Sequence, residues 1–249
     1  MTGHQYLCGV LEEERLTNMD FSQLRNTRDR IERDLKPIRQ YEPRIYYGGS
    51  YGKKTIIKDS FDLDIVIYFP HTDRRPLRNM YESVYHSLNQ AGYRMQEQRV
   101  ALTLQLSRQF HVDVVTGQAK NEDFYYADLY NIAEDSRMRT SLKMHIDDAR
   151  QVKDTIKLMK LWIRRHSLGM QKFAMEQVVI RALGDKDESD LEMSFTTVLQ
   201  YLKSSILNLK LVDLANSNNP IQISETQRRK IKEAADYSYR AESWEDVIW

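Results

Sequence analysis

Cysteine is almost absent from this sequence, which contains a single one, Cys8, among its 249 residues. One cysteine excludes an intramolecular disulfide and a zinc site built from several thiolates, as is usual in a reducing cytoplasm. Long apolar runs are lacking as well. No segment approaches the roughly 20 apolar residues of a membrane span, and the first residues do not form the hydrophobic segment of a signal peptide. We therefore expect a soluble, cytoplasmic protein without a membrane partner.

An excess of charge of either sign is also missing. The sequence has 37 Lys and Arg against 36 Asp and Glu, for a formal net charge of +1. This balance argues against a chain that coats nucleic acid through bulk charge, although a local basic groove is compatible with it, so nucleic-acid binding stays open. The length is sufficient to bury a sizeable core in one large or two small domains.

The two parts of the chain differ in their periodicity. The first part predicts helices over about 20–36, with Asp20 or Ser22 as the cap, and over 80–90. Strands are predicted at 45–47, 65–69, 100–106 and 110–115, with Gly117 ending the last. From residue 147 onward the apolar spacing is helical, and the polar stretch 215–220 is the only low-complexity segment. We predict an α+β fold with a mixed-sheet lobe at 1–145, a helical lobe at 146–249 and a cleft between them.

Residues 48–69 carry the most informative pattern of the chain. A Gly-Gly-Ser sequence at 48–50 is followed, after a short spacer, by Asp62 and Asp64 at the head of the apolar run 65–69. Successive strand residues point to opposite faces, so the two carboxylates share a face and lie about 7 Å apart along the backbone, where they can share divalent cations. The Gly-Ser backbone can approach a phosphate closely. The pattern predicts a metal-assisted phosphoryl or nucleotidyl transferase.

A third carboxylate, Asp113, stands in the predicted strand 110–115 with valines at 112, 114 and 115. An ionised carboxylate in a sheet interior must be paired or bound to a metal. Three converging carboxylates would hold two Mg²⁺ ions, with Mn²⁺ as the alternative metal, and through them a nucleoside triphosphate. Asp113 could also accept the proton of the attacking hydroxyl. Any one of these aspartates alone is better explained as a surface carboxylate at a strand end; their combination with the Gly-Ser turn favours the site.

A row of basic residues follows one face of the predicted helix after residue 147. Lys153, Lys157, Lys160 and Arg164 are separated by four, three and four positions. Two interpretations stay open with equal weight. The row is the solvated face of an amphipathic helix, or one end of it lies in the cleft, where Lys160 contacts the β- and γ-phosphates. His111, on the same strand face as Asp113, is more simply structural than a ligand.

Residues 48–69 together with Asp113 resemble the nucleotidyltransferase signature of the DNA polymerase β superfamily. The resemblance is closest to its oligoadenylate synthetase and cGAS-like branch, which includes bacterial synthases of cyclic oligonucleotides. Three further stretches agree. Lys160-Leu161-Trp162 resembles the Lys-x-Trp of the central helix, residues 173–176 resemble an aromatic-x-apolar-Glu segment, and Asp213 with Asn216 resembles an Asp-Pro followed by Asn. Leu214 replaces the usual proline, and the similarity runs from about residue 20 to 241.

The resemblance implies roles for individual residues. Asp62, Asp64 and Asp113 would bind the metals, and Gly49 and Ser50 the triphosphate. Lys160 would contact phosphates, and so would Lys172, which stands where relatives often have a phosphate-binding serine. The lobe at 1–145 would then be catalytic, and the lobe at 146–249 would close the nucleotide cleft.

The resemblance also implies a function. The chain would be a Mg²⁺-dependent nucleotidyltransferase that makes a cyclic or short linear oligonucleotide second messenger from nucleoside triphosphates. The setting would be bacterial antiphage signalling, with protein regulators of a defence system as partners. Two alternatives stay open. One is a transferase that adds nucleotides to an RNA 3′ end or another acceptor, and the other is a catalytically inactive nucleotide-binding module.

Overall fold

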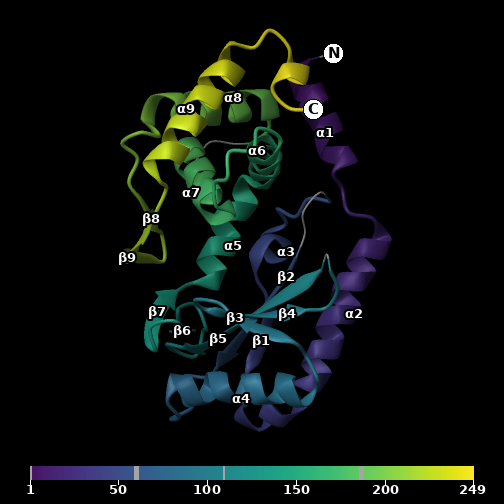
Figure 1. Cartoon of the computed structure of the whole chain (residues 1–249), viewed down its shortest axis with the longest axis vertical. Coiled ribbons are helices and arrows are strands. Elements are labelled where there is room, and N and C mark those ends of the chain that lie inside the picture. Colours follow the sequence, from purple (N-terminus) through teal and green to yellow (C-terminus); the bar gives the residue numbers. More distant parts are fainter. Residues whose placement is uncertain (1, 59–61, 109, 185–187) are drawn as a thin grey trace. The chain divides into compact units, whose positions relative to one another are not determined.

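The computed structural model describes residues 2–58, 62–108, 110–184 and 188–249 (Figure 1). They divide into two compact units. One is Leu16–Ile146, and the other joins the start of the chain up to Arg15 with Asp147–Trp249. The sequence placed the start of the chain in the sheet lobe, whereas the structure packs α1 (Gly3–Glu13) against α6 (Lys153–Arg165) and α8 (Leu191–Ser205). Within the described residues, no helix has both the length and the apolar character to cross a membrane.

The described part of the Leu16–Ile146 unit holds a seven-stranded mixed sheet. Five strands follow the order β1-β2-β5-β4-β3, while β6 pairs with β5 and β7 pairs with β6. The central strands β2 (Leu63–Phe69) and β5 (His111–Ala119) run parallel, and the other recorded pairs are antiparallel. The remaining strands are β1 (Arg44–Tyr47), β3 (Met95–Glu97), β4 (Ala101–Gln105), β6 (Ala127–Asn131) and β7 (Ser136–Thr140).

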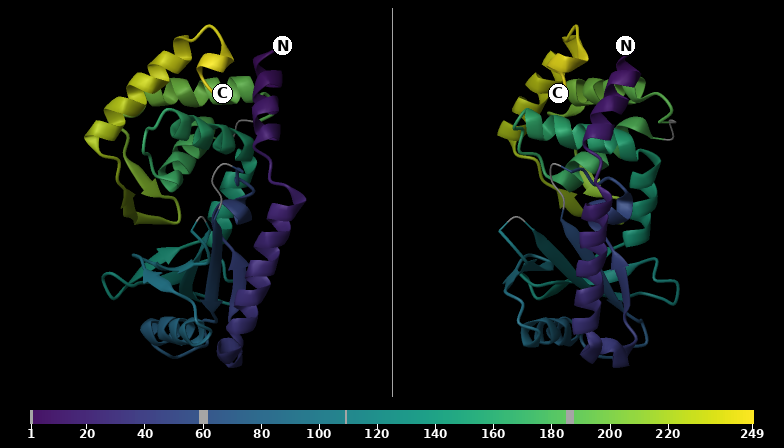
Figure 2. Two further views of the ribbon diagram at one scale, coloured as in Figure 1. Left: turned by 45° about the vertical axis from the view of Figure 1, so that its right-hand side comes forward. Right: turned by 90° about the vertical axis from the view of Figure 1, so that its right-hand side faces the viewer.

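Helices cover one face of this sheet. The core there joins alternate residues of β2, β4 and β5 to the apolar faces of α2 (Asn18–Asp34) and α4 (Leu77–Gln90), with α2 alongside the sheet (Figure 2). Thr17, not Asp20 or Ser22, caps α2: its side chain accepts the Asp20 N–H, and Asp20 in return accepts the Thr17 N–H. The 3-10 helix η1 (Lys36–Tyr41) follows α2, with Pro37 in its first turn.

The prediction that Gly117 ends a strand is wrong, because β5 continues to Ala119. Gly117 pairs with Leu129 on β6, and a β-carbon at this position would lie 2.9 Å from the backbone oxygen of Asp128. The glycine therefore permits close approach of two backbones inside the sheet, as glycine often does in strands. The β6–β7 hairpin that follows was not predicted from the sequence.

The second unit is mostly helical. Beyond α1, α6 and α8 it contains α7 (Lys172–Leu183), α9 (Glu225–Arg240), the 3-10 helix η2 (Trp244–Asp246) and a hairpin of β8 (Leu211–Asp213) and β9 (Asn216–Ile221). α5 (Leu142–Gln151) carries the boundary between the units, so helix begins before the predicted residue 147. The stretch 215–220 contributes to β9, since its polar side chains suit an exposed two-stranded hairpin.

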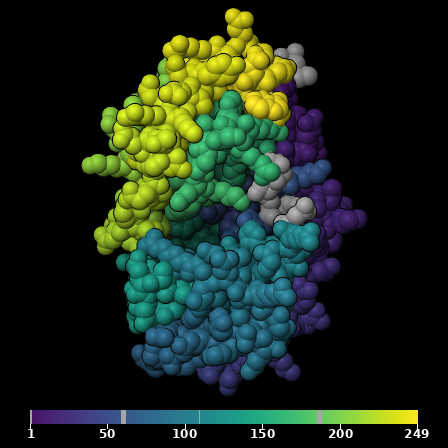
Figure 3. Space-filling view, viewed as in Figure 1, coloured from purple at the N-terminus to yellow at the C-terminus, as the bar shows by residue number. Residues whose placement is uncertain are grey.

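The core of this unit is centred on the fully buried Trp162 of α6. Its indole N–H donates to the Ser238 hydroxyl of α9 over 2.9 Å, which satisfies the one polar group of a buried tryptophan. The outer side of α9, yellow in Figure 3, is exposed in that view. The Lys-x-Trp segment thus serves as a packing element whatever else it does.

Candidate functional site

The predicted carboxylates lie on the face of the sheet that α2 and α4 do not cover. Ile65 on β2 and Val112 and Val114 on β5 point into the core beneath the helices. Because side chains alternate between the faces of a strand, Asp64 and Asp113 project from the opposite face. The sequence predicted a shared face for Asp62 and Asp64, and the parallel pairing extends this face to Asp113.

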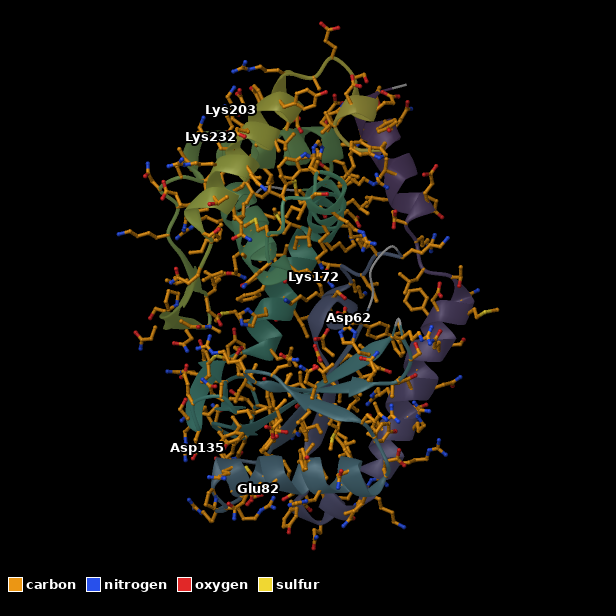
Figure 4. All side chains as sticks on the ribbon, in the orientation of Figure 1. Asp62, Glu82, Asp135, Lys172, Lys203 and Lys232 are labelled. Atoms are coloured by element: carbon orange, nitrogen blue, oxygen red, sulfur yellow. The ribbon has the colours of Figure 1, made fainter. Side chains whose placement is uncertain are left out.

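The register of β2 and β5 places two of the acids side by side. Asp64 and Asp113 are direct partners in the parallel ladder, and neighbouring strands lie about 4.8 Å apart. Asp62 stands two residues ahead, just before β2 begins (Figure 4). Its Oδ2 lies 3.5 Å from Nε2 of His111, the first residue of β5. The three predicted acids therefore stand near the start of two adjacent strands.

Thr103 is a neighbour that the sequence interpretation missed. It lies on β4 directly opposite Asp113, and its hydroxyl donates to Asp113 Oδ1 over 2.5 Å. Leu102 and Leu104 on either side of it are fully buried in the core, so Thr103 shares the face of the acids. The alternation in 100–106 contained this information, but the pairing of β4 with β5 was needed to use it.

The fit of these residues to a metal rests on their chemistry and register. Carboxylate oxygens on adjacent strands are the ligands that Mg²⁺ and Mn²⁺ take, together with waters and phosphate oxygens. In the orientations of this structure, no three Asp, Glu, His or Cys side chains among the described residues are grouped closely enough to hold an ion. Asp62 lies near His111, and Asp113 is bonded to Thr103. Three like charges repel in the absence of a cation, and a bound cation would offset this repulsion.

The predicted Gly-Ser turn is the start of a short helix, α3 (Gly49–Lys53), preceded by Gly48. The Gly48 N–H donates to the backbone oxygen of Asp64 over 2.8 Å, which ties this segment to β2. Gly49 has φ +48°, and a β-carbon there would lie 1.6 Å from Asp64 Oδ2. Glycine is therefore required at this position for two reasons: its φ is positive, and the Asp64 carboxylate leaves no room for a β-carbon.

The Ser50 hydroxyl is a buried polar atom that has no hydrogen-bond partner among the described residues. Leaving such a group unsatisfied costs on the order of 1–3 kcal/mol. Gly49 and Ser50 also occupy the first turn of α3, where backbone N–H groups have no acceptor within the helix. These donors lie on the segment that packs against Asp64, so an anionic oxygen bound there would lie beside the acids.

The two predicted phosphate-binding lysines belong to the other unit. Lys172 is exposed at the start of α7 (Figure 4). Lys160 is buried, and its Nζ lies 3.0 Å from Oε1 of Glu176, with side-chain exposures of 7% and 5%. In the same row, Lys157 pairs with Asp154 over 2.8 Å. The basic row is thus partly an ion-paired helix face, while Lys160 joins α6 to α7.

We expect Lys160→Met to destabilise the chain by about 3–5 kcal/mol, because it leaves the Glu176 carboxylate buried without its cation. The double variant Lys160→Met, Glu176→Gln should regain most of this loss, since it removes both charges. Urea unfolding of the three proteins measures the difference. Equal stability of the wild type and the single variant would contradict a structural role for the pair.

Comparisons with known proteins identify the fold. No protein-family model and no curated protein matches the sequence. Solved structures do match. E. coli MS115-1 CdnC with ATP superposes with a TM-score of 0.75 at 16% identity, covering 99% of this chain and 97% of CdnC. Bradyrhizobium diazoefficiens CdnG, a CD-NTase in complex with GTP, gives 0.75 at 10% identity, with coverage of 98% and 95%.

Rhodothermus marinus CdnE, a c-UMP-AMP synthase, gives a TM-score of 0.66 at 17% identity, with 92% and 95% of the chains covered. This chain has the CD-NTase fold. The predicted α+β architecture and the resemblance to the bacterial cGAS-like branch are thereby confirmed at the level of the fold. CdnC has also been solved in complex with HORMA-deltaN, with a TM-score of 0.73 at 16% identity and coverage of 98% and 96%.

Proposed function

We propose that this chain is a metal-dependent nucleotidyltransferase that joins nucleoside triphosphates into a cyclic or short linear oligonucleotide and releases pyrophosphate. The observation that carries the proposal is the paired register of Asp64 and Asp113, with Asp62 beside them and the Gly48–Ser50 segment packed on Asp64. The shared fold with CdnE, a c-UMP-AMP synthase, supports the same reaction class.

In this proposal the carboxylates and the Gly-Ser segment of the sheet unit have different tasks. Asp62, Asp64 and Asp113 would hold Mg²⁺ or Mn²⁺, which would supply positive charge for the leaving pyrophosphate and for the attacking hydroxyl. The N–H groups of Gly49 and Ser50 and the Ser50 hydroxyl would donate to triphosphate oxygens. Asp113 would accept the proton of the incoming hydroxyl.

The wider setting is part of the same proposal. The substrates would be nucleoside triphosphates, the location the cytoplasm of a bacterium, and the product a signal in antiphage defence. Regulation by a protein partner is supported by CdnC, which was solved with HORMA-deltaN. Lys160 and Lys172 are proposed as phosphate contacts. For Lys160 the role is tested by the Lys160→Met, Glu176→Gln variant, which should fold but bind triphosphate more weakly.

Incubation of the purified chain with labelled triphosphates and Mg²⁺ tests the proposal. Discrete small products that resist phosphatase would support a cyclic oligonucleotide, and phosphatase-sensitive ones a linear oligonucleotide. Extension of an added RNA would favour the tailing transferase. Absence of any product, with each triphosphate singly and in pairs, would favour a nucleotide-binding module without activity.

Thr103→Val should lower the rate of product formation by about 10–100-fold, the usual effect of removing a residue that orients a metal ligand. The reason is the lost hydroxyl donor to Asp113. Thr103→Ser keeps that donor and should restore most of the rate, which separates hydrogen bonding from packing. The Mg²⁺ concentration for half-maximal rate should rise in the valine variant only. A valine variant with unaltered Mg²⁺ dependence would contradict this role.

A further inference from the structure

A cavity lies in the sheet unit, between α2, η1 and the start of β1. Its volume is about 300 Å³, at the lower end of the range of small-molecule sites. Its wall has an apolar part and a charged part. The apolar part is made by Leu35, Ile38 and Ile45, and the charged part by Arg28, Glu32 and Arg39.

The arginines of the charged wall have N–H groups for which few acceptors are present. A guanidinium carries five N–H groups. Arg28 forms an ion pair with Glu32, but its Nε, like Oε1 of Glu32, is buried with no hydrogen-bond partner among the described residues. Arg39 is exposed, and the one hydrogen bond recorded for it in the described residues is a long one, 3.4 Å to the backbone oxygen of Glu32. Two arginines against one glutamate leave this wall with a formal charge of +1.

The apolar wall is built from core residues. Leu35 and Ile38 are only 1% and 2% exposed, so the apolar surface open to a ligand is that of the half-buried Pro43 and Ile45. A ligand with an apolar body would cover this surface, while an acidic group on it would reach the guanidinium groups, which suit carboxylates, sulfonates and phosphates.

We propose that this cavity binds a small organic anion, with an apolar body on Pro43 and Ile45 and its acidic group at Arg28 and Arg39. The site is separate from the carboxylates on β2 and β5. Its lining comes from α2, η1 and β1, on the helix-covered side of the sheet, whereas the acids project from the other face.

Aromatic contacts connect the cavity to α3. The Arg28 guanidinium carbon lies 4.6 Å from the centre of the Tyr47 ring, and that ring lies 4.5 Å from the ring of Tyr51. Tyr51 follows Ser50 in α3. An anion that draws Arg28 away from Tyr47 therefore changes the packing behind the segment assigned to the triphosphate. This regulatory step rests on the proposed function, whereas binding itself does not.

The test uses 8-anilinonaphthalene-1-sulfonate, a fluorescent aromatic anion, titrated into the full chain. Arg39→Glu should weaken binding by at least about tenfold, because it replaces a charge-assisted donor by a repelling acid. Arg33→Glu is the matched control, because Arg33 is exposed on the same helix and does not line the cavity. The affinity of this variant for the probe should stay within about twofold of the wild-type value. Glu32→Gln removes the one acid of the wall and should tighten binding. Circular dichroism checks that each variant is folded.

Non-saturable fluorescence, equal losses in the two charge-reversal variants, or weaker binding by Glu32→Gln would overturn the site. The regulatory step is read separately, as a change of at least about twofold in the rate of product formation at saturating probe in the wild type but not in Arg39→Glu. An unchanged rate would overturn that step. If the wild type makes no oligonucleotide, the proposed function fails, and the fluorescence titration still decides whether the cavity binds anions.

Discussion

Asp64→Asn should abolish oligonucleotide synthesis while leaving the fold intact. Asparagine has the same shape, and the backbone hydrogen bond from Gly48 to residue 64 does not involve the side chain. The substitution removes a charge from the pair formed with Asp113. A metal held by these acids supplies several kcal/mol of charge stabilisation, so the rate should fall on the order of 10³-fold or more. Initial rates at saturating triphosphate and Mg²⁺ measure this loss.

Two further measurements make this prediction specific. Asp29→Asn changes an exposed aspartate on α2 and should keep the wild-type rate. Thermal unfolding should show Asp64→Asn to be as stable as the wild type or slightly more stable, because a repelling carboxylate has been removed. The stabilisation that ATP and Mg²⁺ give to the wild type should disappear in this variant. A rate above about a tenth of wild type would mean that Asp64 does not hold the metal.

Much of the sheet unit was predictable because its signals are local. The short apolar run 65–69 and the stretch 110–115 indicated β2 and β5, and the period of two of a strand fixed which residues share a face. From this, Asp62 and Asp64 could be placed together without coordinates. The resemblance to the nucleotidyltransferase signature then indicated that the strand of Asp113 lies nearby. The structure makes that strand the parallel neighbour of β2, with Asp113 opposite Asp64.

What could not be predicted depends on contacts between distant segments. Thr103 matters through the register of β4 on β5, which no local pattern records. The start of the chain belongs to the helical unit because α1 packs on α6 and α8, more than 100 residues away in sequence. Lys160 looked like one of a row of similar lysines, but only the position of α7 shows that it is buried against Glu176.

The Gly-Ser segment combines both kinds of information. Its composition indicated a tight backbone that could approach a phosphate, and this expectation did not include its contact with Asp64. The structure shows that the carboxylate of Asp64 occupies the space that a β-carbon on Gly49 would take. The glycine therefore allows both the acid and the backbone donor to be in place. The segment proposed to bind phosphate is therefore packed directly on the strand proposed to bind the metal.

Gly49→Ala should accordingly reduce the rate of synthesis by at least about 100-fold and destabilise the chain by about 1–3 kcal/mol. A β-carbon at position 49 would lie 1.6 Å from Asp64 Oδ2, so either the carboxylate or α3 must move. Alanine also disfavours a φ of +48°, at a cost of roughly 1–2 kcal/mol. Displacing a catalytic group by even about 1 Å can cost on the order of 10²-fold in rate. Steady-state rates and urea unfolding measure the two effects.

Two other glycines separate the causes. Gly92 has φ +84° with nothing within 4 Å of an added β-carbon, so Gly92→Ala adds backbone strain without a collision. It should lose stability and keep its rate. Gly9 lies in α1 with open space around it, and Gly9→Ala should stabilise the chain by up to about 1 kcal/mol. If Gly92→Ala and Gly49→Ala lose the same fraction of their rates, strain alone explains the effect, and the contact between Gly49 and Asp64 does not position the acid.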